Sequence, residues 1–336
     1  MNVAAGMEFG TRCAAKIDEN FCGSCSIFDS AGAIFTFMRM SDTLPEAVRA
    51  YYPFASHYAT LPNGHQIHYV DEGVENLTLF LHDIPLWSFF FRNLILSLRN
   101  QFRCLAFDYL GFGFSDKPDG YPYSLRTISQ NAIDFLKKMN VGKFSLVLHG
   151  WGAVPGMVIA QRWPERVNRI VLLNGSCFPD FFPPFSYSFY TTGILGKLLI
   201  DCFNLPVLGA AFSTAIGSYS RKGYRWPYRH RHDRVPMRIF IENLPYAWNE
   251  EDRSWLEEIV GRMPILTHKK FLALWGTRDK MFQHTLLGQW KEELDNFATH
   301  EFPASGRNAL EDEFDTMLPL IRRFLIAGLE PKIPQL

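Results

Sequence analysis

This sequence of 336 residues has no formal net charge, few cysteines and few long apolar runs. Lysine and arginine number 34, and aspartate and glutamate also number 34, so the formal net charge is zero. A balanced charge exerts no general attraction on nucleic acid or on an anionic membrane, and we predict no nucleic-acid partner. Six cysteines are too few for a disulfide framework in a chain of this length. They are interpreted as reduced thiols of a cytoplasmic protein.

No segment predicts a membrane span or a secretory signal. The N-terminus has no basic region followed by an apolar core. The most apolar later segment, residues 193–217, is interrupted by Lys197, Asp201, Asn204 and Pro206. A spanning helix needs about 20 nearly uninterrupted apolar residues. Residues 193–217 are therefore expected to form helices that are buried or that line a groove.

Residues 1–37 differ from the rest of the chain, because they show no sustained hydrophobic period and carry three of the six cysteines. Cys13, Cys22 and Cys25 suggest zinc or redox chemistry. A structural zinc site needs four ligands, and no second cysteine pair follows. The segment is expected to be an N-terminal extension that contributes little to the core. Neither a metal nor a cofactor is predicted anywhere in the chain.

From residue 44 onward the chain alternates between short apolar runs and helical periodicity. A proline-asparagine-glycine turn at residues 62–64 predicts a hairpin. Buried strands are predicted at residues 77–81, 103–107, 144–148, 169–173 and 271–275, and helices at 124–139, 151–163 and 314–327. Such alternation predicts an α/β fold with right-handed βαβ units and a mainly parallel sheet flanked by helices.

The alternation stops at Cys177, and residues 178–261 are aromatic, punctuated by proline and mostly helical in pattern. We therefore predict an inserted helical cap at 178–261 and an α/β core from 38–177 and 262–336. A cap would lie over the carboxyl edge of the sheet, where ligands bind in open α/β folds.

Residues 144–156 read FSLVLHGWGAVPG, a buried strand followed by closely spaced small residues. This pattern is typical of a nucleophile elbow, a tight turn that raises one side chain above the sheet. The raised position is occupied by Gly150. Glycine has no side chain, so the tip of this elbow carries no attacking group.

Several motifs resemble the α/β-hydrolase fold, in the branch that contains haloalkane dehalogenases, epoxide hydrolases and β-lactone decarboxylases. They are YPFASHY at 52–58, HYVDEG at 68–73, FRN at 91–93, SDKP at 115–118 and YRWP at 224–227. The resemblance extends from about residue 52 to the C-terminal helix. It implies a carboxylate that attacks carbon and a histidine that activates water to cleave the resulting ester.

The resemblance also implies that the nucleophile and the base are both replaced. The branch carries His-Asp-Trp-Gly at the elbow, where this chain has HGWG at 149–152. Its histidine base precedes an apolar and acidic turn, and Arg307 stands there within GRNALED at 306–312. Arginine stays protonated and cannot accept a proton from water. Asp279 matches the retained acid and is predicted to pair with Arg307.

Other positions of the resemblance remain partly intact. The His-Gly-Asn-Pro turn of the branch reads HDIP at 82–85. The backbone N–H groups of Ile84 and Trp151 are expected to form an oxyanion hole. Trp151 matches a halide contact, and Asn174 stands where some relatives carry an acid. His149 and Trp151 either line the pocket or pack the elbow, and aromatic residues of 178–190 are expected to join them.

Three functional hypotheses follow, and the sequence leaves enzyme activity, ligand identity and oligomeric state open. The first is a pseudoenzyme that binds a small hydrophobic or acidic ligand under its cap. The second is an active hydrolase of the dehalogenase, epoxide hydrolase or lactone decarboxylase kind that uses non-standard residues. The third is a non-enzymatic partner-binding module. Basic residues between 221 and 232 either attract an anion or form a solvated helix face.

Overall fold

The computed structural model describes residues 26–28, 34–36, 44–181, 183–191, 193–211, 216–244 and 250–327. Strands β1 (Ser26–Phe28) and β2 (Ile34–Thr36) pair with each other in antiparallel fashion. The prediction about Cys13, Cys22 and Cys25 falls outside these residues. Within the described ranges, no cluster of histidine, cysteine and acidic residues is arranged to hold a metal ion. None of the helices described is both long enough and apolar enough to cross a membrane.

The central sheet has eight strands in the order β10-β9-β8-β7-β5-β6-β4-β3. Their bounds are β3 His57–Thr60, β4 Gln66–Glu72, β5 Leu77–Leu81, β6 Cys104–Phe107, β7 Phe144–Gly150, β8 Val167–Gly175, β9 Lys270–Gly276 and β10 Phe297–Phe302. The strands from β10 to β6 pair in parallel, and only β4 and β3 run antiparallel to their neighbours. The predicted mainly parallel sheet is confirmed.

The inner strands form where the sequence offers uninterrupted apolar runs. Every residue of β5 and of β7 is buried, as expected for strands covered on both faces. The β3–β4 hairpin closes at the predicted turn, where Gly64 has a φ of +84°. That left-handed conformation favours glycine because it has no Cβ.

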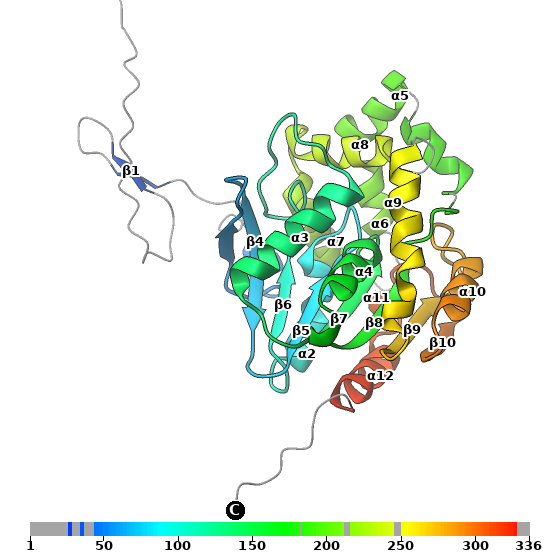
Figure 1. The fold of residues 1–336 in the computed structure, drawn as a ribbon. Coiled ribbons are helices and arrows are strands. Elements are labelled where there is room, and N and C mark those ends of the chain that lie inside the picture. Colours follow the sequence, from blue (N-terminus) through cyan, green and yellow to red (C-terminus); the bar gives the residue numbers. More distant parts are fainter. Residues whose placement is uncertain are drawn as a thin grey trace, which may run out of the picture.

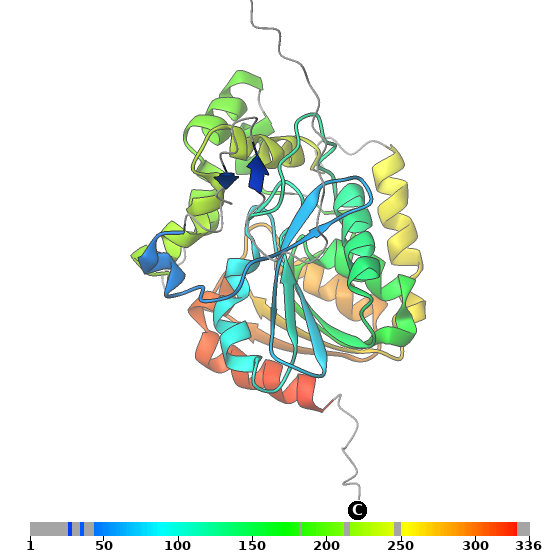
Figure 2. The same ribbon diagram turned by 90° about the vertical axis from the view of Figure 1, so that its left-hand side faces the viewer.

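Helices cover both faces of the sheet (Figure 1). Figure 2 shows α2 (Arg92–Leu98) and α12 (Phe314–Ile326) on one side, and α3 (Leu125–Met139), α4 (Ala153–Arg162) and α10 (His284–Glu293) on the other. Ser124 and Thr127 form a capping box that starts α3, and Asn140 ends it in a left-handed conformation. Four short helices complete the core, α1 (Glu46–Arg49), η2 (Ser88–Phe91), η3 (Pro164–Arg166) and α11 (Ala309–Asp312).

Between β8 and β9 the chain forms helices, and the described part of 178–261 contains no strand. This segment, here called the insertion, contains η4 (Phe185–Thr191), α5 (Gly193–Lys197), η5 (Leu198–Cys202), α6 (Leu205–Ala211), α7 (Ser218–Arg225), η6 (Trp226–Tyr228), η7 (His232–Arg234), α8 (Val235–Glu242) and α9 (Glu250–Gly261), with η9 (Met263–Leu266) beyond it. The end of α9 lies beside α4, where Gln161 Nε2 donates to the carbonyl oxygen of Ile259 at 2.7 Å.

A buried ion pair fastens the insertion to the core. Arg92 of α2 contacts both carboxylate oxygens of Glu311 in α11, at 2.5 and 3.0 Å. Arg92 also donates to Ser220 at 3.0 Å, and the Tyr224 hydroxyl donates to Glu311; both partners belong to α7. These contacts explain the FRN and YRWP motifs, since Arg92 and Tyr224 form one network. We call Arg92, Glu311, Ser220 and Tyr224 the clamp.

Candidate functional site at the strand β7 turn

The turn after β7 has the geometry of a nucleophile elbow. Gly150 ends the strand with a φ of +56°, and α4 begins three residues later. A Cβ on Gly152 would overlap the carbonyl oxygen of Leu81, and a Cβ on Gly156 would overlap the side chain of Leu148. The small residues therefore allow helix α4 to approach the sheet closely. The predicted elbow forms because the sequence places glycine at each of these tight approaches.

The space that a side chain at position 150 would occupy is already filled. A Cβ built on Gly150 would overlap the carboxyl group of Asp83, which follows β5. The Asp83 Oδ1 atom accepts the backbone N–H of Trp151 at 2.8 Å. This N–H is one of the two expected to form the oxyanion hole. A carboxylate therefore stands at the elbow, but a neighbouring loop supplies it.

Arg307 forms an ion pair with Asp83 through its Nε atom and the Asp83 Oδ2 atom. Its two other nitrogens donate to the Tyr187 hydroxyl and to the Ile84 carbonyl oxygen, each at 3.3 Å. The guanidinium also lies 5.0 Å from the centre of the Phe282 ring. Although burial lowers the pKa of Arg307, the Asp83 charge, followed by Tyr187 and Asp279, raises it above its usual range. Arg307 is therefore a permanent cation here.

The predicted pairing of Arg307 with Asp279 is wrong, because these two described side chains form no ion pair with each other and Arg307 contacts Asp83. The Asp279 Oδ1 atom accepts the backbone N–H groups of Met281 and Phe282, at 2.8 and 3.1 Å. It thus caps the turn after β9. Burial raises the pKa of Asp279 to about 6, and the charge of Arg307 opposes that rise. Asp83, which the sequence analysis did not single out, is the carboxylate that pairs with Arg307.

His149 lies beneath the elbow as a neutral ring. Its Nε2 atom is 2.9 Å from the carbonyl oxygen of Arg307, and its ring stacks on Phe90 at 4.0 Å between ring centres. Burial lowers the pKa of His149 to about 4, so near pH 7 the Nε2–H group donates to that carbonyl. The Nδ1 atom is then an unprotonated acceptor, and no described group hydrogen-bonds to it. His149 therefore packs the elbow and holds the loop of Arg307.

Trp151 is only 2% exposed and is surrounded by aromatic rings. Its ring lies 5.0 Å from Phe181 and 6.2 Å from Phe240 of the insertion, and 5.4 Å from Phe282. Of the aromatic residues of 178–190 that were expected beside Trp151, Phe181 contacts its ring, whereas Phe185, which is 78% exposed, and Phe189 are exposed to solvent. Tyr187 turns toward Arg307 from the same helix η4, so the helix presents two different faces.

Asn174 serves the sheet rather than a ligand. Its Nδ2 atom donates to the carbonyl oxygen of Gly276 at 3.0 Å, and its Oδ1 atom accepts the N–H of Gly276 at 2.8 Å. These two bonds tie the end of β8 to the end of β9. Ile84 is buried beside the elbow, and its carbonyl oxygen accepts from Arg307.

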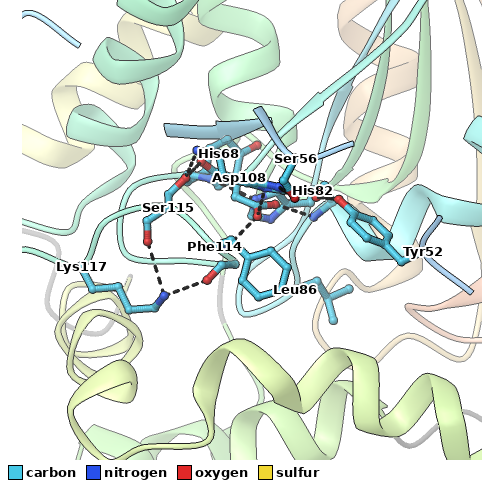
Figure 3. A network of polar contacts seen from close by, with 12 residues as sticks. Tyr52, Ser56, His68, His82, Leu86, Asp108, Phe114, Ser115 and Lys117 are labelled. Carbon is cyan, nitrogen blue, oxygen red and sulfur yellow. Dashed lines mark hydrogen bonds and ion pairs between the residues drawn. The ribbon is translucent and has the colours of Figure 1, made fainter. Parts of the chain in front are cut away.

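A second polar network surrounds Asp108, and Figure 3 shows several of its members. His68 Nδ1 is 2.8 Å from Asp108 Oδ2, and His68 Nε2 is 3.0 Å from Ser56 Oγ. Asp108 also accepts the backbone N–H groups of Ser88 at 2.8 Å and of Phe114 at 2.9 Å. The order serine, histidine, aspartate is that of a catalytic triad. However, both His68 and Asp108 have no exposed surface, and their bonds hold the loop after β6 in place.

Comparison with known proteins identifies the class. The model of the alpha/beta hydrolase fold family matches residues 78–191. A cis-3-alkyl-4-alkyloxetan-2-one decarboxylase from Shewanella oneidensis is 31% identical over 283 residues, which is 81% of this chain and 89% of the relative. Haloalkane dehalogenase 2 from Mycobacterium tuberculosis is 37% identical over 128 residues, covering 38% of this chain and 44% of that protein.

Solved structures agree with this likeness at the level of the fold. The haloalkane dehalogenase DatA from Agrobacterium tumefaciens superimposes with a TM-score of 0.73 at 22% identity, over 82% of this chain and 98% of that one. The chain therefore has the α/β-hydrolase fold. It belongs to the family branch that contains β-lactone decarboxylases and haloalkane dehalogenases, as the sequence motifs predicted.

Proposed function

We propose that this chain is a non-catalytic member of its hydrolase branch, which binds a small hydrophobic or acidic molecule beneath the insertion. The observation that carries the proposal is the Asp83–Arg307 ion pair at the elbow. It places a fixed, paired carboxylate where an active relative needs a free nucleophile. Gly150 itself has no attacking atom.

The chemistry of covalent hydrolysis fails here at two points. The attacking carboxylate must be free, while the oxyanion hole must be open to the charge that develops. Asp83 is held by Arg307 and occupies the N–H of Trp151. In the second step a base must accept a proton from water, and Arg307 is a permanent cation. Because nucleophile and base act as a unit, losing both removes most of the rate.

The preference for a hydrophobic ligand rests on the surroundings of Trp151. Phe181, Phe240 and Phe282 enclose its ring. Aromatic side chains with few polar groups among them suit contact with an apolar ligand. The preference for an acidic group rests on Arg307, whose Nη atoms make only long bonds of 3.3 Å to Tyr187 and Ile84. A ligand carboxylate would offer them closer acceptors.

A second candidate function keeps the chain as an enzyme with Asp83 as its nucleophile. The overlap of the Asp83 carboxyl group with the position of a residue-150 side chain favours it. Attack by the Asp83 carboxylate on the halogen-bearing carbon of a haloalkane would form an alkyl ester on Asp83 and release the halide. This candidate predicts a covalent adduct on Asp83, detectable by mass spectrometry. The main proposal predicts that the protein mass stays unchanged after incubation with a haloalkane.

The decisive experiment is a turnover assay with a β-lactone, a haloalkane and an epoxide. We expect no steady-state turnover by the native chain. Gly150→Asp alone should destabilise the fold, because the new side chain overlaps Asp83. The triple change Asp83→Gly, Gly150→Asp and Arg307→His should restore measurable activity, while Asp83→Gly with Gly150→Asp lacks a base. Native turnover that disappears in Asp83→Asn would contradict the proposal and favour the second candidate.

A thermal-shift screen of fatty acids and alkanes tests ligand binding separately.

A further inference from the structure

The tip of the insertion exposes an unusual number of apolar side chains. Six of them lie on η4, α5, η5 and the residue after η5, namely Phe185, Phe189, Ile194, Leu195, Leu198 and Phe203. Ile194 is 82% exposed and Phe203 is 62% exposed. Figure 1 shows α5 at the end of the molecule opposite to α12. Large exposed apolar patches mark sites where a partner or a membrane binds. We call these six residues the apolar tip.

A basic pocket adjoins the apolar tip. Its cavity of about 210 Å³ is bordered by four cationic side chains, Lys222, Arg225, Arg229 and Arg234, and by no carboxylate among the described residues. Arg234 is fixed by the carbonyl oxygens of Tyr228 and Asp201, each at 2.7 Å. Burial, and then the neighbouring charge of Arg225, lowers the pKa of Arg234, while the charges of Asp233 and Asp201 oppose that lowering. Arg225 and Arg234 thus repel each other, and a bound anion would lessen that repulsion.

The two features form one continuous surface. Arg231 donates to the Cys202 sulfur at 3.0 Å, and Arg234 donates to the Cys202 carbonyl oxygen at 3.2 Å. Cys202 precedes Phe203 of the apolar tip, and Asn204 borders the pocket. The residues of the apolar tip and those that border the basic pocket therefore lie within a few positions of one another around Cys202.

The local charge differs from that of the chain as a whole. Residues 193–238 contain eight lysines and arginines and two aspartates, a net of +6, while the full chain is neutral. A second copy of this surface would be repelled by the same charge. Binding to a nucleic-acid backbone would not bury the exposed isoleucine and leucine side chains. An interface of anionic lipid offers both negative charge and an apolar interior.

From these observations we propose that the tip of the insertion docks on an anionic phospholipid surface. The apolar tip would enter the boundary between headgroups and acyl chains, and the basic pocket would bind a lipid phosphate. This surface lies outside the elbow, so the proposal does not depend on whether the chain is an enzyme.

The test is co-sedimentation of the full chain with vesicles. One set contains equimolar phosphatidylcholine and phosphatidylglycerol, and the other contains phosphatidylcholine alone. We expect binding to the first set that weakens as salt is added. Replacing Lys222 and Arg225 together by alanine should weaken binding about 25-fold, taking each charge as worth roughly a factor of five near such a surface. Ile194→Ser with Phe203→Ser should weaken it by about tenfold or more, because the lost apolar burial is worth at least that.

A matched control pair is Val74→Ser with Lys143→Ala, which removes one exposed apolar side chain and one exposed cation far from the insertion in sequence. It should bind like the native chain. All variants change exposed side chains, so unchanged melting temperatures confirm that they fold. Failure of the native chain to bind the anionic vesicles overturns the proposal, and so does equal binding by the tip and control variants. Loss of self-association in the tip variants, measured by light scattering without lipid, would instead assign the tip to a contact between copies.

Discussion

Two buried arginine–carboxylate pairs in this molecule have the same chemistry and different surroundings. In the clamp, Arg92 contacts both oxygens of Glu311 and also bonds to Ser220, with side chains only 3% and 6% exposed. At the elbow, Arg307 meets Asp83 through one nitrogen, its other bonds are 3.3 Å long, and its side chain is 15% exposed. The pair with more hydrogen bonds joins structural elements, while the pair with fewer hydrogen bonds lies at the elbow after β7.

The comparison suggests that an ion pair which joins structural elements makes more hydrogen bonds than one which changes the chemistry of a site. Burying a charge is costly unless its partners are complete. The clamp comes closer to that condition, because both Nη atoms of Arg92 bond to groups of α7 and α11, while its Nε atom has no hydrogen-bond partner among the described residues. At the elbow the Nη atoms of Arg307 retain capacity for a ligand. The predictions below test this distinction, beginning with the largest expected effect.

Breaking the clamp should lower the free energy of unfolding more than any other change considered below. Arg92→Met leaves Glu311 as a buried, unpaired carboxylate, which typically costs about 3–5 kcal/mol. Urea unfolding should show this loss as a lower midpoint. The double change Arg92→Met with Glu311→Leu should recover much of the stability, because no buried charge remains. Equal losses in the single and double variants would mean that packing, rather than charge, carries the clamp.

Breaking the elbow pair should lower the free energy of unfolding by a smaller amount. Arg307→Met leaves Asp83 without its cation, yet Asp83 keeps the N–H of Trp151. We expect a loss of about 2–3 kcal/mol, below that of the clamp variant. Adding Asp83→Asn should restore most of it. A loss larger than that of Arg92→Met, measured in the same urea titration, would reverse the order that the comparison implies.

Asp279 tests the electrostatics of the elbow through pH. Its pKa is raised to about 6 in the folded protein, against about 4 in an unfolded chain. The folded state therefore binds this proton more tightly, so stability from this group is highest below about pH 4 and falls as pH rises to about 6. Asp279→Asn should remove that dependence and gain about 3 kcal/mol at pH 7. Parallel pH–stability curves for both proteins would contradict the assignment.

The exposed pair of Arg253 and Asp180 is expected to contribute least to the stability of the fold. Its atoms approach to 2.6 Å, but both side chains are largely solvated. Exposed pairs contribute little to folding. Asp180→Asn should leave the urea midpoint unchanged within error, and a measurable shift would show that distance alone, without burial, gives an ion pair its strength here.

Much of the architecture was accessible from the sequence. The buried runs at β5 and β7, the hairpin around Gly64 and the elbow glycines are local patterns, and each appears where it was predicted. That Gly150 and Arg307 are altered catalytic positions was implied by the family resemblance and stays a prediction. The division into an extension, a core and a cap at 178–261 stays a prediction, although the described part of that segment is helical.

What local patterns could not supply was the identity of groups that meet across the fold. The elbow was predictable from the sequence because turns and strands obey short-range rules of backbone geometry, and the resemblance to a family drew attention to Arg307. Asp83 was not, because its carboxyl group reaches Gly150 only through the parallel pairing of β5 with β7. Arg307 likewise meets Asp83 across 224 positions of the chain. Tertiary structure decided these contacts, because the distance between two side chains depends on how the strands are packed and not on their separation in sequence.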